Sequence, residues 1–441
     1  MALGTLLAVI FAAIVIIILG VNQFHQHPFL MLIVGSLFVG IVTGISFSEL
    51  ISLVTSGFGS ILQGIGLIVV LGSIIGLLIE QSGALTVIAY HIVKLFGEKR
   101  LVAAMGVLGA LVSVPVFCDS GFIILSKLGH SLSDGRNRAG LYLSLASGLI
   151  VTHTLIPPTP GPLVVAGNLG ISESIGLMMV MGFIVTIPVL IVSVFFSQRQ
   201  GSKISLEDEQ KQERLNPTMS LLSAIHPILV PIILIAAGSV VSLIEVHIGW
   251  VHSLGNPNIA LLVGVVLGMV QASRKYTLKD QKTIITKAVE QAGPIVLITG
   301  AGGAFGAVLK ATPLTALITQ SFGSELNSIP LILFMSYFIA ALLKTSQGSS
   351  TSALVIASAM MAPVTASIAS MTSFQYVLVA LSMGAGALTV SHANDSYFWV
   401  VTQFSGFSLK QGYRGLTFIT FMQGITIMLC VFLLHFIYSL F

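Results

Sequence analysis

The sequence predicts an all-α polytopic membrane protein, and three observations support this fold class. Of its 441 residues, 55% are hydrophobic and only 8% are charged, whereas soluble domains carry about 25% charged residues. The mean hydropathy is +1.02. Long apolar runs, most of them without a charge, recur along the chain at lengths that suit a bilayer. This composition excludes a secreted disulfide scaffold, a nucleic-acid-binding domain and an ordinary cytosolic enzyme.

Twelve apolar segments account for most of the chain. The first has no Lys or Arg before it and no small-residue cleavage site after it, so we expect a retained span rather than a signal peptide. A helix needs about 20 residues to cross the hydrocarbon, so most segments should cross once. The segments are 3–21, 28–46, 59–79, 101–128, 138–170, 176–197, 222–244, 257–272, 292–309, 328–370, 374–408 and 415–440.

Four of these segments are interrupted by polar residues or prolines near the middle. FCDSG (117–121) and KTSQGSSTS (344–352) interrupt segments that are long enough to fold back, and we expect two re-entrant hairpins. LIPPTPGPL (155–163) and SHANDSYFW (391–399) predict crossing helices with unwound centres. Non-helical backbone at this depth is tolerated only beside protein or a water-filled cavity.

The basic residues predict the orientation of the chain. If the N-terminus is outside and both hairpins are re-entrant, every Lys and Arg except Lys310 and Lys344 falls on the cytoplasmic side. The positive-inside rule favours this arrangement over its opposite. We therefore expect ten crossing helices, two hairpins and external termini. The net charge of +4 reflects orientation and gives no indication of a nucleic-acid partner.

The two halves of the sequence resemble each other. The segment that begins at Gly66 matches the one that begins at Gly293, and GLIVTH and ALTVSH align His153 with His392. Each half contains five crossings, and an odd number makes the second half start on the opposite side, so the repeats are inverted. Secondary transporters have this architecture, with substrate bound where broken helices meet. The predicted parts are a first repeat at 1–197 with its hairpin at 101–130, a cytoplasmic linker at 198–220, and a second repeat at 221–441 with its hairpin at 328–370.

Four ionisable residues at the interruptions are candidates for proton coupling. Asp119 lies in the first hairpin tip and Asp395 in the second unwound stretch, where a carboxylate is functional by default. A helix N-cap is the alternative role for each, and the two roles are compatible. His153 and His392 precede the breaks at equivalent positions and are either tunable groups or structural hydrogen-bonding residues.

Hydroxyls, amides and free backbone N–H groups at the same interruptions are candidates for substrate binding. Helix starts rich in such groups bind anions, although small residues also let helices pack closely. Lys344, next to the second tip, can pair with an Asp, attract an anionic substrate or extend to the interface. The candidate substrate-binding residues are Ser120, Thr159, Gln347, Gly348, Ser349, Ser350, Thr351, Asn394 and Ser396.

No cofactor, metal or catalytic site is predicted. GAGGAFG (300–306) lacks the strand–helix context of a dinucleotide fingerprint, and helix packing explains it better. Cys118 and Cys430 have no metal-ligand spacing around them. Cys118 with His153 as base would be the only basis for an intramembrane enzyme, and nothing else in the sequence supports that function.

At these motifs the chain resembles the gluconate permease family, whose relatives include permeases for gluconate, idonate and D-serine. The likeness runs nearly end to end and includes HPFLMLIVGSLFVGIVTG (27–44) and the segment 298–310. The family's acidic hairpin tip is matched by FCD, with Asp119. Its other polar motifs are matched by Pro157, Pro158 and Pro160 in PPTP, Gly348, Ser349 and Thr351 in GSST, and Asp395, Ser396, Phe398 and Trp399 in DSYFW.

The resemblance implies proton-coupled uptake of a small hydroxy acid across a bacterial cytoplasmic (inner) membrane. It also implies two re-entrant hairpins, a scaffold and a moving transport domain, as in the two-hairpin ion transporters. The partners are then protons, the carboxylate and lipid, with a homodimer as one option. The chain departs from the family pattern at three positions of the expected substrate site. Asp119 stands where the family has Glu, and Thr159 stands where it has His. KTSQ adds Lys344 to a run that is more apolar in the family.

Two alternatives remain at this point. A sodium-coupled carboxylate or dicarboxylate symporter would hold Na⁺ on backbone carbonyls of the unwound segments and on Ser and Thr oxygens. A channel would need a continuous polar lining, whereas the polar residues here cluster at one depth.

Overall fold

The computed structural model describes residues 2–132, 138–206, 219–243, 249–313, 317, 328–368, 371–393 and 395–440. Every regular element within these ranges is a helix. Eight of the described helical stretches are long and apolar enough to cross a membrane. The structure therefore confirms an all-helical, multi-span protein, while ten crossings and external termini stay predictions.

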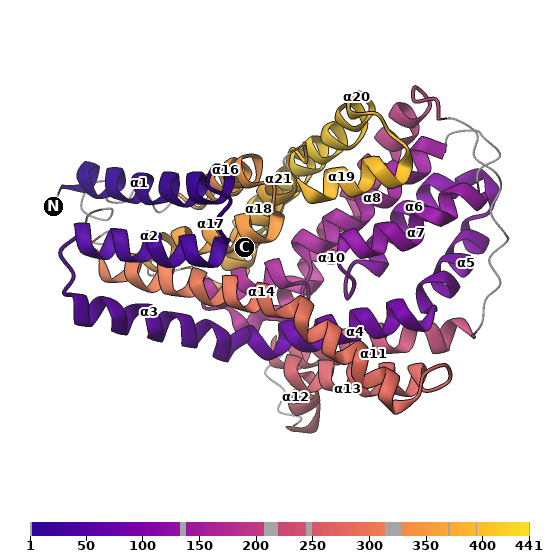
Figure 1. Ribbon diagram of the computed structural model, residues 1–441, viewed down its shortest axis with the longest axis horizontal. Helices are drawn as coiled ribbons and strands as arrows, with labels where there is room; N and C mark the ends of the chain where they lie inside the picture. The colour runs from indigo at the N-terminus through magenta and orange to yellow at the C-terminus, as the bar shows by residue number, and fades with distance from the viewer. Residues whose placement is uncertain are drawn as a thin grey trace.

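The first half consists of α1 to α10 (Figure 1). It contains three structural groups: a helical hairpin followed by a long helix, a pair of helices joined by a short turn, and an interrupted helix followed by a continuous one. Their bounds are α1 (Leu3–Asn22), α2 (Pro28–Val42), α3 (Phe47–Ile61), α4 (Leu67–Ser82), α5 (Ala84–Phe96), α6 (Leu101–Val112), α7 (Cys118–Leu132), α8 (Arg138–Leu155), α9 (Pro160–Asn168) and α10 (Ile175–Gly201).

The described part of the second half repeats this order of elements. Three helices, the second of them short, precede a long one, a helix–turn–helix pair follows, and an interrupted helix precedes the last long helix. The bounds are α11 (Leu221–Leu243), α12 (Gly249–Gly255), α13 (Pro257–Ala272), α14 (Leu278–Ala311), α16 (Ile329–Gln347), α17 (Ser350–Ala366), α18 (Ser373–Leu388), α19 (Ser396–Ser405), α20 (Leu409–Gly412) and α21 (Phe418–Tyr438).

Two helices are much longer than the apolar runs from which they were predicted. A π-helical turn at 62–66 joins α3 and α4 into one stretch from Phe47 to Ser82, and α14 extends over 34 residues. The added segments are amphipathic, so they escape a search for continuous apolar runs. In α3, Leu50, Val54 and Gly57 are buried at helical spacing, and Gly57 lies directly against α14.

Hydrogen bonds from buried side chains tie the two halves together. Asn168 in α9 donates to Ser358 Oγ in α17 at 2.8 Å. The Tyr397 hydroxyl in α19 donates to the carbonyl of Ala146 in α8, also at 2.8 Å. All three of Asn168, Ser358 and Tyr397 are buried. The interrupted helices of one half are therefore fixed against helices of the other half.

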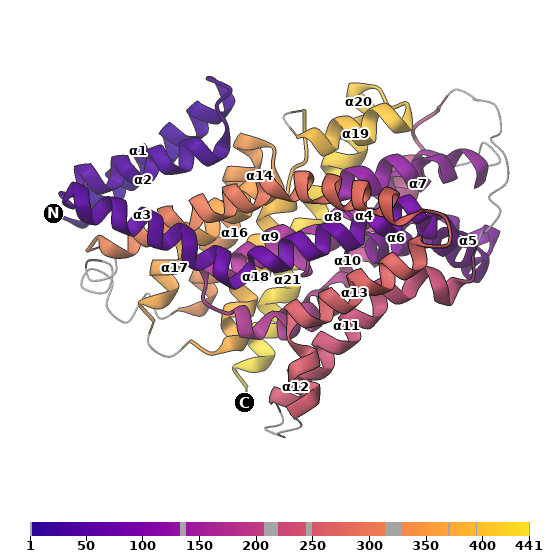
Figure 2. The ribbon, with the colours of Figure 1, turned by 60° about the horizontal axis from the view of Figure 1, so that its bottom comes forward.

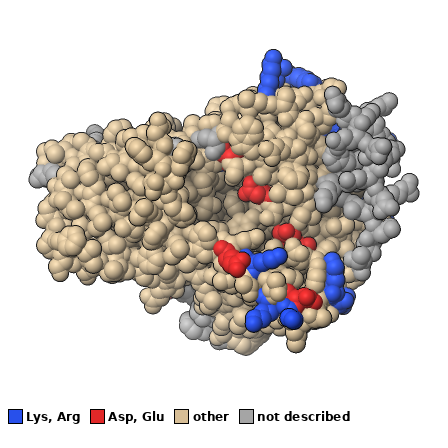
Figure 3. All heavy atoms as spheres, viewed as in Figure 1, with Lys and Arg blue, Asp and Glu red and all other residues tan. Residues whose placement is uncertain are grey.

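Charged side chains are concentrated toward one end of the molecule. In Figure 3, the Lys and Arg residues of the visible face lie near α20 and around the α13–α14 connection. The opposite end, formed by α1, α2 and α3 in Figures 1 and 2, shows no charged side chain on that face. The large exposed side chains of α1 and α2 are apolar, among them Phe11, Leu30 and Ile41. This distribution suits helices surrounded by lipid.

Candidate functional site

The first helix–turn–helix pair presents its turn to α4. The turn comprises residues 113–117, between the end of α6 and the start of α7, and contains Pro115. Gly76 of α4 lies against it so closely that an added Cβ would be 2.3 Å from the Pro115 carbonyl oxygen. Only glycine allows this approach, so the position of the turn depends on a residue 39 positions earlier.

Asp119 lies in the first turn of α7 and has an incompletely satisfied carboxylate. Its Oδ2 is 3.8 Å from Cys118 Sγ. Its buried Oδ1 has no hydrogen-bond partner among the described residues. A buried polar atom without a partner is uncommon and calls for an explanation such as a bound ligand or water. Asp119 Oδ1 is therefore a buried acceptor that the described residues leave open.

His153 and the first break line a cleft with this turn. His153 is buried in the last turn of α8, 6.4 Å from the Phe117 ring between centroids. Its Nδ1 has no partner in the described ranges, and Thr159 Oγ1 donates to the Ile156 carbonyl across the break at 2.5 Å. The cleft is narrow, and its lining is Val69, Gly72, Ser73, Val114, Pro115, Val116, Phe117, His153, Pro158, Thr159 and Pro160.

The second helix–turn–helix pair has a shorter turn with both helix ends capped. Gly348 adopts a left-handed conformation (φ 75°) and donates its N–H to the Lys344 carbonyl, which ends α16. Ser349 caps α17 by accepting the N–H of Ser352 at 3.2 Å. Gln347 is buried, and neither of its side-chain amide atoms has a partner within the described structure. Gln347 thus offers both a donor and an acceptor.

A buried ion pair connects this second turn to the second break. Lys344 Nζ lies 2.6 Å from Asp395 Oδ2, with 1% and 3% of the two side chains exposed. Nζ also donates to the Gly348 carbonyl at 2.9 Å. Asp395 caps α19 by accepting the Tyr397 N–H on Oδ1, and Ser391 donates to its Oδ2. Of the three roles considered for Lys344, the structure shows pairing with an Asp.

The four interruptions meet in one region. Lys344 and Asp395 both lie within electrostatic range of Asp119 and of His153. The rings of Phe122 in α7 and Tyr397 in α19 pack edge to face, with centroids 6.3 Å apart. Residues from α7, α8, α16 and α19, far apart in sequence, therefore surround one polar centre in an apolar interior.

The other candidate residues are placed unequally. Ser350 and Thr159 are buried, whereas Ser120 and Thr351 are partly exposed beside the turns. Ser396, in the first turn of α19, is exposed, unlike the two residues of the buried ion pair. His392 is partly exposed, with Nε2 3.0 Å from the Thr345 carbonyl oxygen. Asn394 lies outside the described residues.

Three residues of the site were not anticipated from the sequence. Ser391 and Tyr397 complete the bonding of Asp395, and Ser73 adds a hydroxyl to the cleft wall. Ser391 could have been noticed because it lies four residues before Asp395 in the same polar stretch. Ser73 is one small polar residue in an apolar helix, a pattern too common to be informative.

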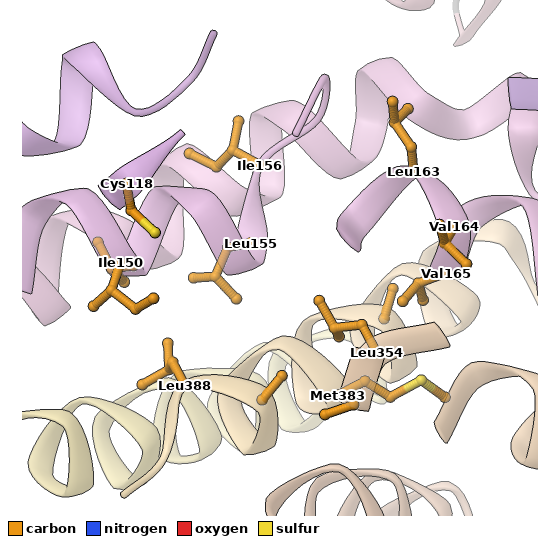
Figure 4. Close-up of a cluster of buried hydrophobic side chains, with 14 of the residues drawn as sticks. Cys118, Ile150, Leu155, Ile156, Leu163, Val164, Val165, Leu354, Met383 and Leu388 are labelled. Carbon is orange, nitrogen blue, oxygen red and sulfur yellow. The ribbon is translucent and has the colours of Figure 1, made fainter. Parts of the chain in front are cut away.

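The surroundings of Cys118 are apolar. Figure 4 shows it with Ile150 and Leu155 in a cluster to which α17 and α18 contribute Leu354 and Leu388. The thiol is 4% exposed. Among the residues that the structure describes, no group of three His, Cys, Asp or Glu side chains could hold a metal ion.

A second cleft, which we call the apolar seam, separates the first turn and first break from α11 and α13. It is narrow and adjoins the site cleft at Gly72, Val114, Pro115 and Pro158. Its remaining lining residues are Ile75, Met179, Pro227, Ile228, Pro231, Ile232, Ile235 and Leu261.

A solved structure has a similar fold. The chain matches the crystal structure of the Alcanivorax borkumensis YdaH transporter with a TM-score of 0.60 and 16% sequence identity, over 88% of each chain. At this identity the similarity describes the fold alone.

Sequence comparisons identify the family. The profile of the GntP family permeases matches residues 5–437. The inner membrane permease YgbN of Escherichia coli is 30% identical, over 96% of each chain. The gluconate permease of Bacillus subtilis is 28% identical, over 90% of this chain and 92% of the relative. The D-serine transporter DsdX of Escherichia coli is 29% identical, over 96% and 97%. The chain therefore belongs to the GntP family of permeases, and it is a membrane transport protein rather than an enzyme.

Proposed function

We propose that this permease takes up a small hydroxy-carboxylate, such as gluconate or a related sugar acid, together with protons. One observation carries the proposal: the four interruptions meet around Asp119, whose buried Oδ1 has no partner among the described residues. Relatives named as gluconate permeases support the substrate class.

The charges at the site favour entry of a proton with an anion. Lys344 and Asp395 compensate each other as an ion pair, so Asp119 carries the unbalanced carboxylate. A substrate anion a few ångströms from an ionised Asp119 would be repelled, and the repulsion is strong where water is excluded. Protonation of Asp119 removes the repulsion, so loading of a proton and loading of a carboxylate favour each other. His153 and His392 are the further candidates for proton transfer.

The groups around the two turns suit a polyhydroxylated acid. The first residues of α17, Ser350 and Thr351, bring hydroxyls and the positive end of a helix dipole, which together attract a carboxylate. The amide of Gln347 can donate to and accept from substrate hydroxyls. Ser120, Thr159, Gly348, Ser349, Asn394 and Ser396 complete the proposed set.

We further propose that the halves are inverted repeats and that both helix–turn–helix pairs are re-entrant. The repeated order of elements and the collection of basic side chains toward one end support this arrangement. It would place the protein in the cytoplasmic membrane with external termini, with the site alternately open to each side.

Proteoliposomes test the function directly. Purified protein is reconstituted, and uptake of labelled gluconate is measured with and without an inward proton gradient, beside D-serine and unrelated carboxylates. We expect gluconate or a close sugar acid to accumulate only with the gradient, and a protonophore to abolish accumulation. Uptake indifferent to both treatments would contradict proton coupling.

Sodium coupling is the second candidate, because backbone carbonyls of unwound segments and Ser and Thr oxygens at the turns can bind Na⁺. Replacing external Na⁺ with choline at constant pH gradient distinguishes the two. Uptake that requires Na⁺ would favour the sodium symporter.

D-serine is a further substrate option, since one relative is a D-serine transporter. Its ammonium could pair with ionised Asp119 without a proton. Accumulation of D-serine without a proton gradient would favour D-serine as the substrate bound at this site.

A further inference from the structure

We propose that the Lys344 ammonium occupies a cation site formed by the Gly348 carbonyl and the Asp395 carboxylate. When the Lys344 side chain is removed, this site can bind Na⁺ instead. The existence of the cation site does not depend on the substrate. Its consequence, that the native permease needs no Na⁺, rests on the proposed function.

The location of the ammonium is the first argument. Nζ lies 2.6 Å from Asp395 Oδ2 and 2.9 Å from the Gly348 carbonyl oxygen. Gly348 directly follows α16, where backbone carbonyls lack helical partners and the helix dipole is negative. A carbonyl at the end of a half-helix together with a carboxylate is a donor set typical of Na⁺ sites in transporters.

The burial of the pair is the second argument. Only 1% of Lys344 and 3% of the Asp395 side chain are exposed. A buried carboxylate that loses its cationic partner is strongly destabilising. The site therefore requires a positive charge, and a small monovalent ion can replace the ammonium at oxygens that remain in place.

The fixed position of these oxygens is the third argument. Asp395 Oδ1 accepts the Tyr397 N–H at 3.0 Å, and Ser391 holds Oδ2. Tyr397 is itself held by the bond to Ala146. Gly348 is fixed by its N–H bond to the Lys344 backbone carbonyl, which any side chain at position 344 preserves. The ligands should therefore survive truncation of Lys344.

A thermal-shift experiment on the purified full-length protein tests the proposal, with Na⁺ itself as the probe. Melting temperatures of wild type and Lys344→Ala are compared in NaCl, KCl and choline chloride at equal ionic strength. We expect Lys344→Ala to melt about 3 °C or more higher in saturating NaCl than in choline, with a saturable dependence. Wild type and Lys310→Ala, which removes an exposed lysine, should not respond to Na⁺ specifically.

The double variant Lys344→Ala/Asp395→Asn provides the second arm. It lacks both charges, so it should fold without Na⁺ and show no specific response. If Lys344→Ala cannot be obtained folded in Na⁺ while the double variant can, Na⁺ does not replace the ammonium and the proposal is wrong. A folded Lys344→Ala without a Na⁺ response, or a wild type stabilised by Na⁺, overturns it equally.

These outcomes are separate from the test of transport. Na⁺ stabilisation of Lys344→Ala supports the site even if gluconate is not the substrate. Conversely, proton-driven gluconate uptake by the wild type can be verified while Lys344→Ala ignores Na⁺, in which case only the cation site is rejected.

Discussion

Asp119 and Asp395 occupy corresponding interruptions, but their surroundings differ. Asp395 accepts hydrogen bonds from a lysine, a serine and a backbone N–H, all supplied by the protein. Asp119 faces a weak thiol donor on one oxygen and has no partner in the described structure on the other. We infer that Asp395 holds the second turn and second break together, and that Asp119 is the exchangeable group.

Asp119→Asn should separate substrate movement from proton-driven accumulation. The amide preserves the shape of the side chain but cannot carry the coupling proton. With one coupled proton, a gradient of one pH unit drives accumulation of about tenfold, and this should fall to the level of equilibration. Exchange of labelled for unlabelled substrate should persist. Full accumulation by the variant would exclude Asp119 as the coupling group.

Asp395→Asn should mainly affect stability. It leaves the buried Lys344 ammonium without its counter-charge, which costs about 3–5 kcal/mol. Adding Lys344→Ala removes the stranded charge and should recover much of this loss. Denaturant titration of both variants in detergent measures the effect. Equal stability of Asp395→Asn and wild type would show that the pair contributes nothing.

The alignment of the two halves predicted where equivalent residues lie in the fold better than it predicted their surroundings. His153 and His392 align, yet His153 is buried beside Phe117, whereas His392 is partly exposed and contacts the Thr345 carbonyl. The ion pair between Lys344 and Asp395 joins residues 51 positions apart, so spacing could not select it from the three roles considered. The chemistry of a residue can be predicted from its type and depth, but its partner depends on tertiary packing.

At the scale of helices, close contacts position the turns. The passage of α4 along the first turn depends on Gly76, while a Cβ added at the aligned Gly306 of α14 would be 3.7 Å from Ala359 of α17, an ordinary contact. The two halves therefore share their order of elements but not their contacts. The close approach of α4 to the first turn at Gly76 has no equivalent at Gly306.

Gly76→Ala should destabilise the protein and impair transport. The added methyl group would overlap the Pro115 carbonyl, and relieving such overpacking costs about 1–3 kcal/mol. Gly59→Ala in α3 is the matched control, because nothing lies within 4 Å of its added Cβ. That control should be neutral or gain up to about 1 kcal/mol. Thermal melting measures the stability of both variants, and initial uptake rates measure their transport. If Gly76→Ala and Gly59→Ala gave the same results, the close contact at Gly76 would be rejected.

Helices were predictable where they are uniformly apolar and less so where they are amphipathic. The interruptions were located to within a few residues, because prolines and polar clusters cannot continue an apolar helix. The first turn, 113–117, begins four residues before the predicted FCDSG (117–121), so Asp119 lies in the first turn of α7 and not in the turn itself. The first 12 residues of the α3–α4 stretch were missed, because Ser48, Glu49 and Ser52 mask the buried stripe.

At the scale of the whole molecule, the distribution of charge predicts sidedness. The Lys and Arg side chains on the visible face of Figure 3 gather near α20 and around the α13–α14 connection, and none is visible at the end formed by α1, α2 and α3. The positive-inside rule assigns the end with α20 to the cytoplasm.

Single cysteines should verify this sidedness. In a Cys118→Ala/Cys430→Ala background, Lys310→Cys should react with a membrane-impermeant thiol reagent in right-side-out vesicles, and Lys410→Cys only after permeabilisation. Both side chains belong to exposed residues, so access in detergent is the common control. Reversed labelling would invert the proposed topology and exclude external termini.

The apolar seam next to the site has a mechanical consequence. Bonds such as Asn168 to Ser358 and Tyr397 to Ala146 join the interrupted helices of the two halves into one block. The side chains that face α11 and α13 across the apolar seam come from the first turn, the first break, α4 and α10, and they are apolar apart from a glycine in α4. Dispersion contacts have no preferred direction and re-form after a small displacement, whereas directional bonds must break first. We infer that a small displacement of this block along the apolar seam would leave the hydrogen bonds inside the block intact.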